Sequence, residues 1–308
     1  MPIARLFKAL PLAIALAAVP AVAQDTPTPD AKAEAPRSIL FIGNSFTQGA
    51  HSAAVRYGAA SVTDLNGNGI GGVPALFHRF AEESGEAWTV SHELRGGRTL
   101  AQHLVDRPDV FAKPWDVVVM QEFSVLDPKN PGNPAATLKS APAIAGAVTR
   151  ANPDVRVYMT ATWSRADLTY KPDGHWYGQP IDRMARDLRV ALDSVDAASD
   201  DIDGVIPVGE AWNRAMGEGV ADPNPYDGVG FGKLDLWTYD QYHASAAGYY
   251  LEALVVFGRV TGIDPRTLGD KETAAYDIGL SPHSAAALQR VAAEQLGLPA
   301  APDRVRTP

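Results

Sequence analysis

The feature that most constrains the fold of this 308-residue chain is an alternation of apolar, strand-length runs with amphipathic helical patterns. Most of the apolar runs are continuous, which is typical of strands buried on both faces of a parallel sheet. These runs lie at residues 38–43, 88–94, 115–121, 155–161 and 204–209. The helical patterns, with apolar residues at intervals of three and four, lie at 73–85, 99–104, 142–152, 181–195, 245–262 and 284–297. The alternation predicts a three-layer α/β/α sandwich around a central, mostly parallel five-stranded sheet.

The two ends of the chain differ from this pattern. Arg5 and Lys8 precede an apolar run that ends in Ala-Val-Ala, which predicts a signal peptide at residues 1–23, cleaved after Ala23. The apolar run is too short for a membrane anchor to be the better interpretation, so we expect a periplasmic or secreted protein.

The remaining sequence divides into one long segment and two short ones. Residues 24–36 mix proline, alanine and charges without apolar periodicity and are expected to form a disordered linker. Residues 37–300 contain no internal repeat and no second linker, so we expect one domain there, followed by a disordered tail at 301–308. Two loops, 51–72 and 217–239, have the character of insertions that would shape a substrate cleft.

Composition excludes several classes of function. The chain has no cysteine, which rules out disulfides, thiol catalysis and cysteine-ligated metals. Its 27 basic and 36 acidic residues give a formal net charge of −9, which argues against nucleic acid or anionic membrane partners. We therefore expect a small-molecule or carbohydrate substrate.

The first apolar run ends in Gly43-Asn44-Ser45, where a sharp turn would present the serine hydroxyl above the sheet edge. Such exposure is what a nucleophile requires. The alternative is that Ser45 caps the following helix, because serine is a favoured N-cap residue.

A nucleophilic serine needs a base held in one orientation by a third group. Asp240 lies three residues before His243, just ahead of a helical pattern. One short turn can place this carboxylate against one imidazole nitrogen while the other nitrogen faces a serine elsewhere. The alternative is that both residues merely decorate a helix start.

Together these stretches resemble the SGNH (GDSL-like) hydrolase superfamily, which implies a flavodoxin-like fold and no cofactor. The resemblance implies that Ser45 is the nucleophile, His243 the base and Asp240 its partner. It also implies that the oxyanion hole combines the backbone N–H groups of Ser45 and Gly97, the latter in ELRGGRTL (93–100), with a side-chain amide. That side chain is asparagine in the family, whereas VVVMQEFS (117–124) places Gln121 there.

Glutamine at this point resembles a bacterial subgroup that shares GNSFT, GG-x-TL-x-x-H, H-x-S-x-x-G-x-Y-L and TG-x-D-P, the last two matched by 243–251 and 261–265. The resemblance runs from about Ile39 to the final helix, except for the two insertions. Four further residues are candidates for substrate binding beside these motifs: Asn44, Gly96, His103 and Trp237.

Other features have competing interpretations. Residues 64–70 match the start of a calcium loop, but the twelfth position is Ala75 instead of glutamate, and Asn-Gly pairs are ordinary turn formers. The remaining histidines show no metal-ligand spacing. Aromatic residues crowd the loops expected near the cleft, where they suit sugar rings or aryl groups, or else bury area under the loops: Trp163, Trp176, Tyr177, Trp237, Tyr239 and Tyr242.

The sequence therefore predicts an exported serine esterase that acts without a cofactor or metal, most plausibly on an O-acetyl or short acyl group of a carbohydrate. That substrate rests on analogy, because one fold serves many substrates. A lipase-like or aryl esterase with the same triad is the first alternative. A non-catalytic carbohydrate-binding or surface scaffold protein is the second, and Gln121 is the feature that favours it.

Overall fold

The computed structural model describes Met1 and residues 35–299. The predicted signal peptide beyond Met1, most of the predicted linker and the predicted tail lie outside the described residues. The chain divides into two units, 1–35 and 36–308, and the second carries the fold described below. Within the described residues, every helix is too short or too polar to cross a bilayer.

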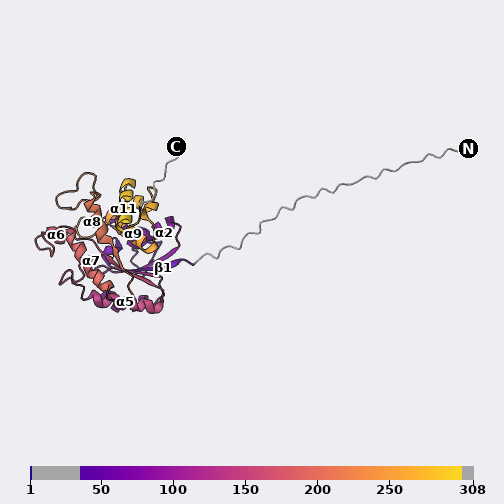
Figure 1. Cartoon of the computed structure of the whole chain (residues 1–308), viewed down its shortest axis with the longest axis horizontal. Helices are drawn as coiled ribbons and strands as arrows, with labels where there is room; N and C mark the ends of the chain where they lie inside the picture. Colours follow the sequence, from indigo (N-terminus) through magenta and orange to yellow (C-terminus); the bar gives the residue numbers. More distant parts are fainter. Residues whose placement is uncertain (2–34, 300–308) are drawn as a thin grey trace. The chain divides into compact units, whose positions relative to one another are not determined.

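A parallel sheet forms the centre of the second unit (Figure 1). Its strand order is β2-β3-β1-β4-β5-β6, and every neighbouring pair is parallel. The strands are β1 (Arg37–Gly43), β2 (Thr63–Asp64), β3 (Trp88–Leu94), β4 (Val117–Met120), β5 (Arg156–Ala161) and β6 (Val205–Pro207). The α/β fold with its parallel sheet is confirmed, and all five predicted strands form.

The sixth strand, β2, differs from the prediction. It consists of two residues inside the 51–72 loop, and they pair with Ser91 and His92 of β3 at the sheet edge. A two-residue strand shows no periodicity, so the sequence pattern contains no signal for it.

Helices cover both faces of the sheet, because consecutive strand residues point to opposite sides. In β1, Ile39 and Phe41 belong to one core, and Leu40 and Ile42 belong to the other. The first core packs against α2 (Gly72–Glu83), α8 (Val208–Gly217), α9 (Ala246–Thr261) and α11 (Pro282–Gln295). The second packs against α3 (Leu100–Asp106), α4 (Pro108–Phe111), α5 (Thr137–Ala151) and α7 (Arg183–Asp196). Figure 1 shows α5 on the side of the sheet opposite to α2, α9 and α11.

Short elements complete the unit: α1 (Ser45–Gln48), α6 (Ala166–Tyr170), α10 (Thr273–Asp277) and the 3₁₀ turns η1 (Ala53–Arg56) and η2 (Pro265–Thr267). The chain leaves β1 for β3 on one side and later returns to β4 on the other. In doubly wound sheets, ligands bind where the strand order reverses in this way, at the carboxyl ends of the strands. Here that point lies between the ends of β1 and β4.

Candidate active site

Ser45 is the first residue of α1, two residues beyond the end of β1. Asn44, not Ser45, is the N-cap, and its side-chain oxygen accepts a hydrogen bond from the Phe46 N–H at 3.2 Å. The alternative in which Ser45 caps the helix is therefore not what forms, and the serine hydroxyl is left for other contacts.

Gly43 lets this turn pack closely against the end of β4. A side chain at this position would bring its Cβ to 2.8 Å from Oε1 of Gln121 and 3.1 Å from Cβ of Gln121. Those contacts are closer than side-chain atoms normally approach. A glycine before Asn44 is thus required by the neighbouring strand end.

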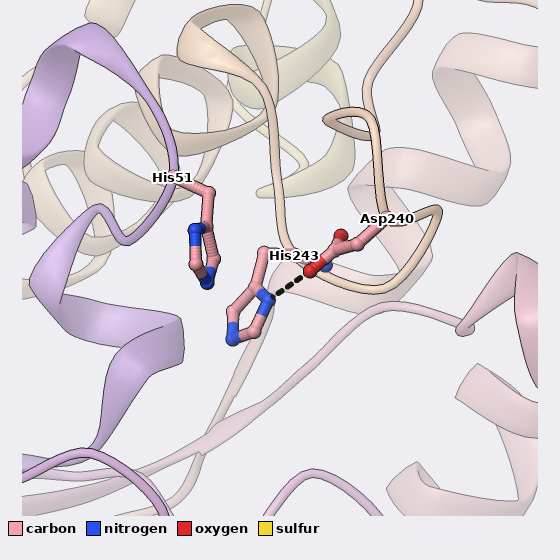
Figure 2. Close-up of side chains that lie close together, drawn as sticks. All are labelled: His51, Asp240 and His243. Carbon is pink, nitrogen blue, oxygen red and sulfur yellow. Dashed lines mark hydrogen bonds and ion pairs between the residues drawn. The ribbon is translucent and has the colours of Figure 1, made fainter.

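Asp240 and His243 lie in the turn that precedes α9. One carboxylate oxygen of Asp240 accepts hydrogen bonds from the backbone N–H groups of Tyr242 at 3.0 Å and His243 at 2.9 Å. The other oxygen lies 2.6 Å from Nδ1 of His243, as Figure 2 shows. Ser245, not Asp240, caps α9, so the aspartate holds the imidazole instead of the helix.

The fold brings the three residues together. Nε2 of His243 lies 2.9 Å from Oγ of Ser45, although the two residues are 198 positions apart. Tyr249 of α9 strengthens this junction, because its hydroxyl donates to the carbonyl oxygens of Ser45 at 3.1 Å and Ala50 at 3.3 Å. Serine, histidine and aspartate thus form one continuous hydrogen-bonded series.

The surroundings shift both titratable groups in the series. Burial lowers the pKa of His243, because it disfavours the imidazolium, and the hydrogen bond and charge of Asp240 oppose this shift only in part. Burial raises the pKa of Asp240, but the hydrogen bonds from His243 and Tyr242 outweigh it, so the net pKa is lowered. At neutral pH the site therefore holds a neutral imidazole beside a carboxylate.

The backbone N–H groups of Ser45 and Gly97 have no hydrogen-bond acceptor among residues 35–299. Gly97 lies with Gly96 in an exposed loop after β3 and has a φ of 70°, a region that favours glycine. The side-chain nitrogen of Asn44 donates to the carbonyl of Arg98 at 3.0 Å. Asn44 thereby ties the Gly97 loop to the serine turn.

Gln121 follows β4 and is buried beside the serine turn. Its Oε1 accepts the backbone N–H of Asn44 at 2.9 Å, which fixes the orientation of the amide, and its Nε2 donates to the carbonyl of Glu122. Both ends of the amide thus have a partner in the backbone. Because the nitrogen of a primary amide carries a second N–H, the expectation that this amide serves the oxyanion stays a prediction.

Three of the candidate substrate-binding residues lie in the interior. Asn44 is buried and engaged as described above. His103 is 1% exposed and pairs through Nδ1 with the buried carboxylate of Glu93. Trp237 is also 1% exposed, and its indole N–H donates to the carbonyl of Ser164 at 2.9 Å. Only Gly96 of the four is exposed, so packing accounts for the other three side chains.

The tryptophans of the aromatic loops are buried, Trp163 and Trp237 in the first core and Trp176 in the second. Phe46 stacks on Trp163 with ring centres 4.3 Å apart, and Trp163 stacks on Trp212 at 4.7 Å. Trp176 is buried as well. These tryptophans therefore bury area under the loops and do not present their faces to a substrate. Tyr239 differs, because it is 74% exposed beside the site.

The sequence analysis missed His51. It is exposed, lies after α1 in the 51–72 loop and has a φ of 62°, which is uncommon outside glycine. Its ring centre lies 4.7 Å from that of His243, and Figure 2 shows the two rings beside each other. Its Nδ1 lies 2.9 Å from the hydroxyl of Tyr239. No spacing in the sequence pairs it with His243, since a folded-back loop brings the two rings together.

The polar side chains of the 64–70 loop form hydrogen bonds with the loop backbone and with neighbouring arginines. Asp64 accepts backbone N–H groups from Asn66, Asn68 and Ile70 at 2.9, 2.8 and 3.2 Å. The side-chain oxygen of Asn66 accepts from the guanidinium groups of Arg95 and Arg107. The side-chain oxygens of Asp64 and Asn66, at the first and third positions of the calcium-loop pattern, are therefore engaged by donors of the protein, which gives the loop a structural role.

Comparison with known proteins gives structural likeness only. No protein-family model and no curated protein matches the sequence. Among solved structures, a DUF4886 family protein from Bacteroides uniformis is 18% identical, with 88% of this chain and 98% of that chain covered and a TM-score of 0.58. The chain shares the α/β fold of that protein. A structure from Parabacteroides merdae described as a GDSL-like lipase is 17% identical, with 73% of this chain and 95% of that chain covered and a TM-score of 0.49. TesA is 15% identical, with 73% of this chain and 99% of that chain covered and a TM-score of 0.45. At such identities a match speaks for the fold alone.

Proposed function

We propose that this chain is an exported serine esterase that hydrolyses its substrate through an acyl-enzyme. The observation that supports it most is the continuous series from Oγ of Ser45 to His243 at 2.9 Å and from His243 to Asp240 at 2.6 Å. The series lies where the strand order of the sheet reverses, which is where such folds bind ligands.

In the proposed reaction, Nε2 of His243 takes the proton of the Ser45 hydroxyl as the oxygen attacks the ester carbonyl. Asp240 stabilises the imidazolium that forms. The imidazolium then returns the proton to the alcohol that leaves. A water molecule, deprotonated by the same nitrogen, attacks the acyl group on Ser45 and releases the acid.

The oxyanion of each tetrahedral intermediate requires hydrogen-bond donors that are already in position. We assign this function to the N–H groups of Ser45 and Gly97, because both lack a protein acceptor among the described residues. Each is worth about 3 kcal/mol if it behaves like other oxyanion donors. Gln121 instead holds the serine turn against the end of β4 through the N–H of Asn44.

A short acyl group on a carbohydrate, such as an O-acetyl group, is the substrate class that we favour. The exposed ring of Tyr239 lies beside the site through its contact with His51, and an exposed aromatic face suits a sugar ring. The leader at residues 1–23 would export the enzyme to where such polymers occur. Sequencing the N-terminus of the exported protein should find Gln24 first.

The test is hydrolysis of p-nitrophenyl acetate, butyrate and octanoate by residues 24–308. Ser45→Ala and His243→Ala should each abolish turnover, whereas the exposed His283→Ala serves as a matched control and should retain it. A preference for acetate supports the acetylesterase, and a preference for octanoate supports the lipase-like alternative. Equal background rates in the folded parent and both mutants would refute ester hydrolysis on these substrates and favour the scaffold protein.

A further inference from the structure

The two histidines at the site are arranged like a pair of metal ligands. Nδ1 of His243 is engaged by Asp240 at 2.6 Å, and Nδ1 of His51 is engaged by the hydroxyl of Tyr239 at 2.9 Å. Each imidazole therefore has its Nε2 left for another partner, and that of His243 faces Ser45. The two histidines and Asp240 offer ligand atoms that all lie within 4.8 Å of one another.

The separation of the rings fits one shared ion. A tetrahedral zinc ion bound to two Nε2 atoms at about 2.0–2.1 Å places the ring centres about 5 Å apart. The ring centres of His51 and His243 are 4.7 Å apart, with the ring planes inclined by 59°. The separation of the two rings therefore matches that of two imidazoles bound to one ion.

The outer contacts of both rings are those of metal-bound histidines. Such histidines usually donate their second N–H to a carboxylate, a carbonyl or another oxygen, which orients the ring and makes the ligating nitrogen more basic. Asp240 provides that partner for His243, and the oxygen of Tyr239 provides it for His51. The hydrogen-bond partners that orient metal-bound imidazoles are therefore already present for both histidines.

His51 is also held in a costly conformation. A positive φ of 62° disfavours a histidine, and strain of this kind persists where neighbouring groups enforce it. The hydroxyl of Thr238 donates to the carbonyl of His51 at 3.0 Å, so the loop that carries Asp240 and His243 also fixes His51. The two ligands are positioned by the same segment.

We propose that His51 and His243 bind a zinc ion through their Nε2 atoms and that this ion reversibly inhibits the enzyme. The inhibition rests on the proposed function, whereas the binding does not. The lone pair of Nε2 that would accept the Ser45 proton forms the bond to zinc instead. Two neutral imidazoles bind without releasing a proton, and water or the Ser45 hydroxyl completes the coordination.

The experiment combines calorimetric titration with zinc chloride and ester hydrolysis at controlled free zinc. The parent should bind one zinc, and hydrolysis should fall about tenfold when free zinc reaches ten times the Kd. His51→Asn, chosen because asparagine tolerates positive φ, should lose this binding, so that zinc should not lower its rate of hydrolysis below the rate that the same variant has without zinc. Tyr239→Phe should weaken binding by about tenfold or more, because it removes the outer contact.

The control is His283→Asn, which removes an exposed histidine in α11 and should leave zinc binding unchanged. Equal zinc binding by the parent and His51→Asn, or zinc that raises hydrolysis, would overturn the proposal. If the parent binds zinc through His51 but hydrolyses no ester, the metal site stands and the proposed function fails.

Discussion

Replacing Asn44 with alanine should reduce both the stability and the rate of this protein, because one side chain performs two tasks. Its oxygen caps α1 through the Phe46 N–H, and its nitrogen holds the carbonyl of Arg98. Loss of the cap costs about 1 kcal/mol. Loss of the second bond costs about 1 kcal/mol more, since water can reach the exposed Arg98. A total of about 2 kcal/mol should lower the Tm by about 4–8 °C.

The effect on rate should come from the Gly97 loop. The bond from Asn44 to the carbonyl of Arg98 ties the loop that carries Gly97 to the serine turn. If the N–H of Gly97 serves the oxyanion as proposed, loss of this bond lets the donor move, and a donor out of position costs up to about a hundredfold in kcat. Asn44→Asp keeps an oxygen for the cap but replaces the donor with a second carboxylate oxygen, which would face the carbonyls of Arg98 and Glu122. It should therefore lower kcat as alanine does, and because residue 44 is buried, the carboxylate should destabilise the fold at least as much as alanine does.

The assay is steady-state hydrolysis of p-nitrophenyl acetate together with thermal unfolding of both variants. If Asn44→Ala and Asn44→Asp retain the kcat of the parent, the link between Asn44 and the oxyanion hole is refuted. If Asn44→Ala unfolds at the same temperature as the parent, the assignment of the cap is refuted.

Four further outcomes follow from the site and its surroundings. Because the pKa of His243 lies below the ordinary value of 6.5, the acid limb of kcat/KM against pH should have its midpoint below 6.5, and a midpoint above it would contradict the burial argument. By the same shift, unfolded His243 binds protons more readily than folded His243, so its contribution to stability should be lost as the pH falls below about 6.5 in urea titrations. Asp240→Asn keeps an oxygen for the turn but places an N–H against Nδ1 of His243. The kcat should therefore fall about 10⁴-fold with little change in circular dichroism. Substantial turnover by this variant would argue against the triad. Phe46→Ala removes the ring stacked on Trp163 and should lower the free energy of unfolding by about 3–5 kcal/mol, whereas a loss similar to that of Phe46→Leu would show that the stack matters little.

The sheet was predictable because its strands are buried on both faces and are therefore apolar throughout. The strand β2 has only two residues, and α6 and α10 have five each, so these elements are too short to show a period. The order of the strands required knowing which way each crossover runs, which the apolar pattern does not contain. The parallel α/β class followed from the alternation alone.

The residues of the site were predictable only where the residue type and its neighbours in the sequence indicate a chemical role. Ser45, Asp240 and His243 stand out locally, but the contact between the serine and the histidine depends on the whole fold. Gln121 carries an amide, yet the direction of that amide is set by the backbone N–H of Asn44. His51 has no motif, because its position results from a loop that folds back on residues 238–243.

Burial was the least predictable property of the loops. An aromatic or a histidine in a loop near the site can face the cleft or the core with the same sequence signature. Trp237 faces the core because the carbonyl of Ser164 lies there and accepts the hydrogen bond from its indole N–H. His103 faces inward because Glu93 is buried opposite to it. In both cases the partner is remote in sequence.

The separation of Ser45 from His243 by 198 positions has a consequence for refolding experiments. Nearly the whole domain must be synthesised and docked before the hydroxyl meets its base, whereas the helices on either side form from local contacts. Contacts at long sequence separation form slowly because loop closure opposes them. Recovery of hydrolysis after dilution from denaturant would therefore lag behind recovery of helical circular dichroism. The rate at which hydrolysis recovers would measure how fast the last segments dock on the sheet.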